Sequence, residues 1–225
     1  MQGQLMQHYG QTQTHERMST HGSKICKVNM QMGGDVMARA GSMIAYEGLI
    51  QFNPNPPQIA NMVRSWATGE GVPLMIATGQ GDLYLADYGK EVIVLQLTGE
   101  SLSVNGKNIL AFDASLQWNI ERVQGVSMLS GMGMFNVVIR GQGWVALTSK
   151  GTPILLDTRE AETFVDTDAL VGFTEGLRIK PKRTARLGGL IGRGSGEAFQ
   201  LGFHGQGFVL VQPSEDQRPN LSIRG

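Results

Sequence analysis

The sequence is poor in cysteine, in net charge and in long apolar runs, and each shortage excludes a class of protein. Cys26 is the only cysteine among 225 residues, so no intrachain disulfide can form and a reducing compartment is expected. No apolar run approaches the length that a transmembrane helix needs. Basic and acidic residues balance at 19 each, which leaves no net charge to attract polyanions. We therefore expect a cytoplasmic protein that does not bind nucleic acid.

The common catalytic and cofactor-binding motifs are also missing. The chain has no Gly-x-Ser-x-Gly nucleophile motif, no phosphate-binding loop and no dinucleotide fingerprint. A cupin-type metal enzyme needs two or three histidines and a carboxylate on adjacent strands, yet only His204 lies outside the N-terminal segment. Cys26 lies in an apolar strand pattern and is interpreted as a small core or edge residue. We expect no enzymatic activity, no catalytic residue, no metal site and no cofactor.

Both ends of the chain are polar. Residues 1–22 have neither the apolar core of a secretory signal nor the Arg-rich, acid-free composition of a transit peptide. We therefore predict that 1–22 and 213–225 form flexible tails, and that 23–212 forms a single domain.

Glycine, by contrast, is abundant, and the tripeptide Gly-Gln-Gly occurs three times. The 31 glycines are about twice the usual share, as expected of a fold with many tight turns. Each tripeptide joins two apolar runs. Since glycine adopts positive φ without steric cost, we predict that the glycines form tight turns in three β-hairpins. These glycines are Gly79, Gly81, Gly141, Gly143, Gly205 and Gly207.

A second motif alternates with these tripeptides at a matching interval. It is centred on an aromatic residue, which is Tyr46, Phe112 or Phe173. A small residue precedes each aromatic, and we predict that it lets a second backbone pass close by, because a larger side chain would overpack the site. The small residues are Ala45, Ala111 and Gly172. The apolar residues that flank this pair are Ile44, Leu110 and Val171 before it, and Ile50, Leu116 and Leu177 after it.

The two motifs divide the chain into three tandem units, at about 23–86, 87–149 and 150–212. One unit of this size buries too little apolar surface to be stable alone. We predict an all-β protein with three structural repeats in a β-sandwich or double-stranded β-helix-like arrangement with pseudo-threefold symmetry. One or two short helices are expected, one of them amphipathic at 59–66.

Basic residues gather in the third unit without any acid among them. They are Arg178, Lys180, Lys182, Arg183, Arg186 and Arg193. The apolar run 187–191 lies within the same segment. Cations beside a short apolar tip suit an anionic membrane surface, where each contributes about 1 kcal/mol. The alternative is a solvated loop whose apolar residues pack onto their own domain.

The stretch RAGSMIAYEGLI, the ATGEG stretch at 67–71 and the repeated Gly-x-Gly resemble the altered-inheritance-of-mitochondria 24-type family over 23–212. The resemblance implies a fold like that of the tryptophan RNA-binding attenuation protein, with three repeats about a pseudo-threefold axis. One departure is Gly-Gln-Gly, where many members have Gly-Pro-Gly. The family implies no catalytic residues. Its eukaryotic members are associated with mitochondrial inner-membrane organisation, which implies a scaffolding or membrane-proximal role, and this chain resembles the bacterial cytoplasmic members.

Three functions are weighed against this pattern. The first is a non-enzymatic β-rich scaffold or binding protein that forms a homo-oligomer, with a protein partner or an anionic membrane surface as further partners. Charged residues at only 17% favour a surface partly covered by association. The second is a ring-type protein that binds RNA or another polyanion, although no cation recurs at equivalent positions. The third is a metal-dependent cupin-like enzyme. We expect the first.

Overall fold

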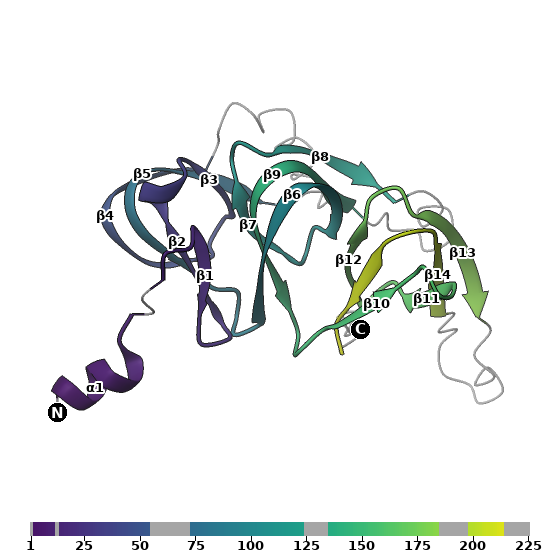
Figure 1. Ribbon diagram of the computed structural model, residues 1–225, viewed down its shortest axis with the longest axis horizontal. Coiled ribbons are helices and arrows are strands. Elements are labelled where there is room, and N and C mark those ends of the chain that lie inside the picture. The colour runs from purple at the N-terminus through teal and green to yellow at the C-terminus, as the bar shows by residue number, and fades with distance from the viewer. Residues whose placement is uncertain (1, 12–13, 55–72, 124–134, 185–197, 214–225) are drawn as a thin grey trace, which may run out of the picture.

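The computed structural model describes residues 2–11, 14–54, 73–123, 135–184 and 198–213, and these residues are mostly β-strand (Figure 1). The prediction of an all-β protein is confirmed. One α-helix, α1 (Gln2–Tyr9), and a 3-10 turn at Met30–Met32 complete the structure. The amphipathic helix predicted at 59–66 lies outside the described residues. Among the described residues, no helix is long and apolar enough to cross a bilayer.

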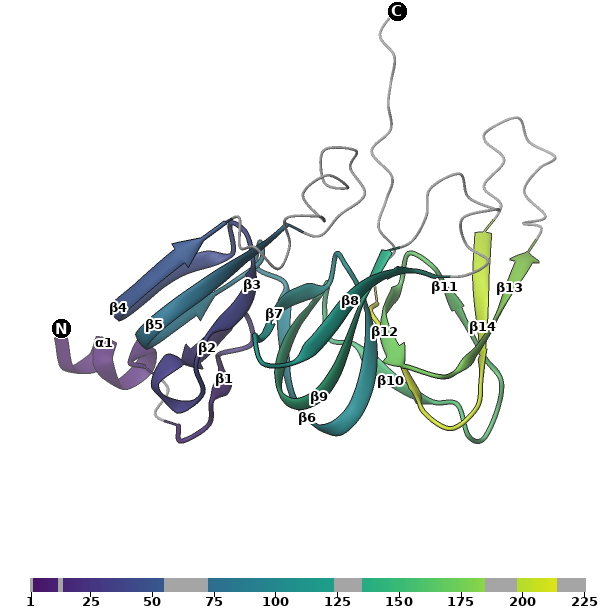
Figure 2. The same ribbon diagram turned by 90° about the horizontal axis from the view of Figure 1, so that it is seen from above.

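The strands form three groups that follow one another along the molecule (Figure 2). The first group contains β1 (Met18–His21), β2 (Ile25–Asn29), β3 (Val36–Arg39), β4 (Met43–Asn53) and β5 (Leu74–Leu85). The second contains β6 (Glu91–Asn105), β7 (Ile109–Asp113), β8 (Gln117–Arg122) and β9 (Phe135–Ser149). The third contains β10 (Ile154–Asp157), β11 (Thr163–Asp166), β12 (Leu170–Thr174), β13 (Arg178–Thr184), β14 (Ala198–His204) and β15 (Phe208–Val211).

Each group is organised around its last strand or pair of strands. β5 pairs with β4 along one edge and with β2 and β3 along the other. β9 pairs with β7 and β8 along one edge and with β6 along the other. In the third group, β14 pairs with β13 on one side and with β11 on the other. β15 pairs with β12 on one side and with β10 on the other. A pseudo-threefold axis and a double-stranded β-helix-like arrangement stay predictions.

Two antiparallel pairings join the groups into one sheet. β3 pairs with β7, and β6 pairs with β12. The resulting 12-stranded sheet follows a path from β1 to β10, with β4 and β8 beside this path, while β11, β14 and β13 form a separate sheet of three. The path does not close on itself within the described residues, so the molecule has two ends.

The Gly-Gln-Gly tripeptides do not form hairpins, and that prediction was wrong. Gly79 and Gly81 lie inside β5, and Gly141 and Gly143 lie inside β9, each a continuous strand. Gly205 and Gly207 fall between β14 and β15, which pair with different strands of their group. Positive φ is present at Gly79, Gly141 and Gly205, with values of +113°, +117° and +131°. A positive φ within a strand bends it instead of reversing it, so the apolar runs on either side are two halves of one path.

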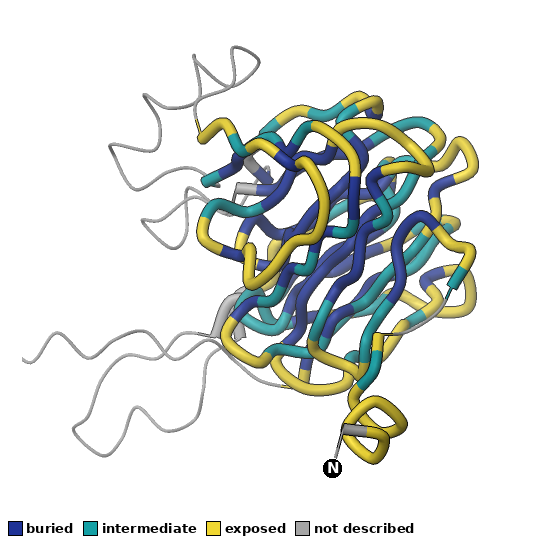
Figure 3. Tube along the Cα trace, turned by 90° about the vertical axis from the view of Figure 1, so that its left-hand side faces the viewer, coloured by how far each residue is buried: buried dark blue, intermediate teal, exposed yellow. Residues whose placement is uncertain are grey.

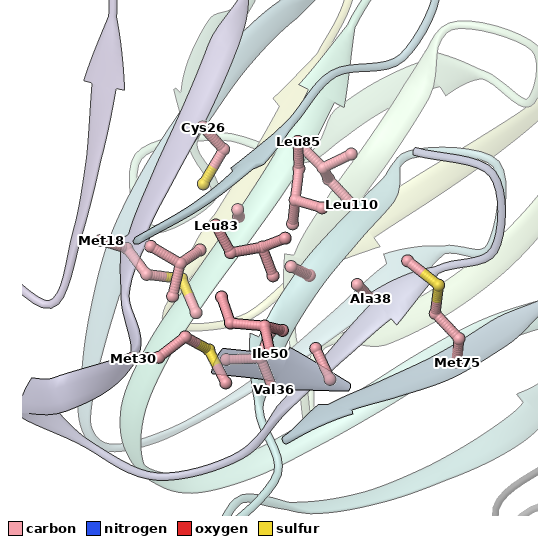
Figure 4. Close-up of a cluster of buried hydrophobic side chains, with 14 of the residues drawn as sticks. Met18, Cys26, Met30, Val36, Ala38, Ile50, Met75, Leu83, Leu85 and Leu110 are labelled. Carbon is pink, nitrogen blue, oxygen red and sulfur yellow. The ribbon is translucent and has the colours of Figure 1, made fainter. Parts of the chain in front are cut away.

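Buried side chains form three clusters, and the first two extend across the boundary between groups. The first cluster belongs to β1–β5 but also takes in Leu110 and Ala111 from β7 (Figure 4). The second likewise takes in Val171 from β12. Each of these two cores is therefore completed by a strand from the group that follows.

Cys26 lies in the first cluster and is fully buried. Burial raises the pKa of its thiol to about 12, because the thiolate would lose its hydration. The interpretation of Cys26 as a core residue is confirmed.

The N-terminal tail is shorter than predicted. β1 pairs with β2, and Met18 is fully buried in the first cluster. Arg17 is buried too, and its guanidinium bonds the Asp113 carboxylate at 3.0 Å and the carbonyl oxygens of Asn29 and Gly34. Residues 17–21 are mostly polar, so their sequence lacks the apolar alternation that predicts a strand. They are held instead by the β1–β2 pairing and by the Arg17–Asp113 ion pair.

Candidate functional site

β13 carries the cations that the sequence singled out. Because side chains alternate along a strand, Arg178, Lys180 and Lys182 share one face, and all three are exposed. Arg183 lies on the same strand. Arg186 and Arg193 fall outside the described residues.

This cationic face has an aromatic neighbour and no acidic partner in the described chain. Lys182 Nζ lies 4.1 Å from the centroid of the Phe164 ring on β11. None of the ion pairs within the described ranges involves Arg178, Lys180 or Lys182. Cations that are exposed and not neutralised by nearby carboxylates can bind phosphate groups from solution or from a surface.

β4 forms one end of the molecule and exposes apolar side chains along its length. Figure 3 looks onto this end and shows exposed chain in front of buried strands. Among the described strands, β4 pairs only with β5. Ile44 and Tyr46 are 52% and 47% exposed, and Leu49 is 85% exposed. The aligned counterparts of Ile44 and Tyr46 are buried: Leu110 and Phe112 are 0% exposed, and Val171 and Phe173 are 0% and 5% exposed.

The last strand group, toward the other end of the molecule, exposes apolar side chains as well. On β10, Ile154 and Leu155 are 57% and 60% exposed, and on β11 Phe164 is 42% exposed. Within the described chain, β11 pairs only with β14, so its other edge is open. With Met43 of β4, which is 37% exposed, the two end surfaces together hold seven of the twelve large exposed apolar side chains of the described residues.

A cleft of about 290 Å³ lies where β6, β9 and β12 meet, with Phe173 in its wall. Asn136 in this cleft is 1% exposed, donates to Ser103 Oγ at 2.8 Å and has an Oδ1 atom with no donor among the described residues. Glu175 lines the same cleft, and hydrogen bonds from Arg140 hold the pKa of its carboxyl below the ordinary value. The cleft therefore contains a buried hydrogen-bond acceptor, Asn136 Oδ1, and a carboxylate, Glu175, whose charge is paired with Arg140.

A shallower groove of about 500 Å³ runs over β4 and β5 and is lined in part by Tyr46, Leu49 and Gly79. It belongs to the same end surface as the exposed residues of β4.

His204 is exposed at the end of β14, as expected of a strand-surface residue. Within the part of the chain that the structure describes, no three residues of the metal-binding types lie together. The six motif glycines lie at bends, as described above, and line no catalytic arrangement in the described residues.

The end surface on β4 was missed by sequence reasoning, although the signal was present. The repeat alignment placed Tyr46 beside Phe112 and Phe173 and so predicted one environment for all three. In the described chain no strand group precedes the one that contains β4, so none covers it, and that difference was open to prediction from the order of the predicted units.

The family model of the mitochondrial biogenesis AIM24 family matches residues 17–214. The chain belongs to the AIM24 family. The AIM24 match begins at Arg17, which is also the first buried residue of the described chain.

A solved structure supports the AIM24 fold. The crystal structure of protein SPYM3_0169 from Streptococcus pyogenes is 24% identical in sequence and has a TM-score of 0.67, over 88% of this chain and 92% of that chain. This likeness shows the fold alone. No curated protein matches the chain. A closer relation of the AIM24 fold to the tryptophan RNA-binding attenuation protein stays a prediction.

Proposed function

We propose that this AIM24-family protein is a non-enzymatic scaffold that self-associates in the cytoplasm. The observation that carries the proposal is the row of exposed apolar side chains on β4, namely Ile44, Tyr46 and Leu49. Single exposed apolar residues are ordinary, whereas several along one open strand are typical of an interaction surface. Such a strand also offers backbone N–H and C=O groups to a partner strand.

Light scattering coupled to gel filtration tests self-association directly. We expect a mass that is a multiple of the 24.4 kDa chain and that falls on dilution, because edge-strand contacts exchange with solvent. A single 24.4 kDa species at every concentration up to the solubility limit would contradict the proposal.

A second candidate function, binding to an anionic membrane surface, is favoured by the cationic face of β13. Lys180 and Lys182 are exposed on that face and have no acidic partner in the described chain. Replacing both with glutamine should weaken binding to phosphatidylserine vesicles ~30-fold, since each cation contributes about 1 kcal/mol near such a surface.

Vesicle flotation at low and physiological salt measures this effect. Lys24→Gln with Arg159→Gln is the matched control, because it removes the same charge from exposed positions outside β13. Equal loss of flotation in both double variants would assign the binding to overall charge and not to β13.

A further inference from the structure

The two strand pairings that connect neighbouring strand groups, β3 with β7 and β6 with β12, are called joints here, and they share one geometry. At the first joint, Met37 of β3 lies opposite Phe112 of β7. At the second, Ser103 of β6 lies opposite Phe173 of β12. Both joints are short antiparallel pairings, and in both the aromatic residue becomes buried.

At each joint, the residue before the small residue inserts its side chain into the core of the preceding strand group. The strand register shifts across Leu110 in β7 and across Val171 in β12, which leaves each of them as an unpaired, bulged residue. Leu110 packs into the first cluster, where it lies beside Leu85 (Figure 4), and Val171 packs into the second. A joint therefore combines strand pairing with one side chain inserted into the preceding core.

A close backbone approach at the joint requires the small residue that the motif contains. A Cβ added at Gly172 would lie 2.9 Å from the carbonyl oxygen of Ser103, which belongs to the partner strand. Ala111 occupies the same place at the first joint, opposite Ala38. The prediction that a small residue here admits a second backbone is confirmed at Gly172, and it stays a prediction at Ala111.

β4 has every feature of a joint strand except a neighbouring strand from a preceding group in the described chain. Its register shifts across Ile44, the small residue is Ala45, and the aromatic residue is Tyr46. The Tyr46 ring contacts Phe52 edge-on at 5.4 Å, as Phe112 contacts Trp118 at 5.5 Å. β4 is thus built to join a preceding group, although it lies in the first one.

β11 is the complementary strand at the other end of the molecule. Met37 lies opposite Ile76, three residues before Gly79, and Ser103 lies opposite Val138, three residues before Gly141. Phe164 lies opposite Gly202, three residues before Gly205. Phe164 therefore holds the position that faces the aromatic residue at both internal joints, and no described strand pairs with the edge of β11 that faces away from β14.

We propose that copies of this chain join head to tail, with β4 of one copy pairing antiparallel with β11 of a second copy. The internal joints set the register: Tyr46 lies opposite Phe164, Ala45 opposite Val165 and Glu47 opposite Thr163. Ile44 enters the third buried cluster, which includes Phe173, Leu201 and Phe203 and which, among the described residues, takes none from a following group. The inference rests on the proposed self-association and assigns its surfaces.

The positions of the two strands fit such an assembly. Both views of the ribbon place β4 at one end of the molecule and β11 in the last group toward the other (Figures 1 and 2). Each copy can then use both surfaces at once and continue the sheet from copy to copy. Since the two surfaces differ, the contact is heterologous, and it builds a ring or an open chain of copies.

Two edge variants of the full chain test the proposal by light scattering. The β4 variant carries Ile44→Asp with Tyr46→Asp, and the β11 variant carries Phe164→Asp. Each variant alone is expected to be monomeric, because every junction in a pure sample contains one altered surface. An equimolar mixture is expected to form dimers and to stop there, since one native junction is available and no second one.

Tyr88→Asp is the matched control. Tyr88 is fully exposed in the turn between β5 and β6 and belongs to neither end surface. This variant is expected to assemble as the unaltered chain does. Circular dichroism should show unchanged β-structure in all variants, because the replaced side chains are about half exposed or more.

The outcomes distinguish the proposal of self-association from the proposal that β4 pairs with β11 of a second copy. A monomeric unaltered chain would overturn self-association and the head-to-tail contact together. An unaltered chain that assembles, beside a folded β11 variant that assembles equally well, would leave self-association standing and overturn the β4–β11 contact. Folded variants that are both monomeric and form no dimer on mixing would overturn it as well.

Discussion

Replacing Asp113 with alanine is expected to lower the free energy of unfolding by about 3–5 kcal/mol. Asp113 binds the Arg17 guanidinium at 3.0 Å, and its second oxygen accepts from the backbone N–H of Trp144 at 2.8 Å. Both charged side chains are nearly inaccessible to water. Without Asp113, the Arg17 charge would stay buried with carbonyl oxygens alone, and the Trp144 N–H would lose its acceptor.

Urea unfolding followed by tryptophan fluorescence measures the change. Asp157→Ala is the control, because Asp157 also pairs with an arginine, Arg159, but both side chains are largely in solvent. A solvent-exposed ion pair contributes little to stability, so this variant should be close to the unaltered chain. Equal effects at the two aspartates would show that burial of the Arg17–Asp113 pair does not determine its contribution.

Gly81→Ala is expected to destabilise the protein by about 3–5 kcal/mol. Gly81 has a φ of +142° and lies opposite Gly48 of β4. A Cβ at this position would overlap the carbonyl oxygen of Glu47, which is backbone and cannot move without breaking the β4–β5 pairing. The strain of the dihedral and the steric overlap act together.

Gly143→Ala tests whether this effect belongs to the tripeptide or to its surroundings. Gly143 is the counterpart of Gly81 in the second tripeptide, but its φ is not positive and an added Cβ would meet the Leu116 side chain at 3.1 Å. A side chain can move slightly, so the expected cost is about 1 kcal/mol. Thermal unfolding of both variants gives the comparison, and similar losses at Gly81 and Gly143 would contradict the explanation.

The sequence predicted the periodic elements well, since alternating apolar residues and glycine spacing depend on local geometry. It did not predict how the glycines are used, because positive φ is equally compatible with a hairpin turn and with a bent strand. β5 and β9 show the second use. The choice between them depends on which strands lie alongside, and pairing of distant strands leaves little trace in local sequence.

The candidate surfaces show even more clearly that local sequence does not predict contacts between distant strands. Tyr46, Phe112 and Phe173 occupy equivalent places in the motif, yet only Tyr46 is exposed. Composition around each residue is similar, and the difference comes from whether a neighbouring group covers it. The cations of β13 could be found from sequence because charge does not depend on tertiary contacts.

The sharing of side chains between groups also bears on the order in which the chain folds during synthesis. The first core includes Leu110, and Arg17 has its carboxylate partner 96 residues downstream. The second core in turn includes Val171. Since a ribosome delivers the chain from its N-terminus, β1–β5 must remain incomplete until β7 emerges, and β6–β9 must wait for β12. In the nascent chain, each of the first two cores therefore remains incomplete until the following strand group has been synthesised.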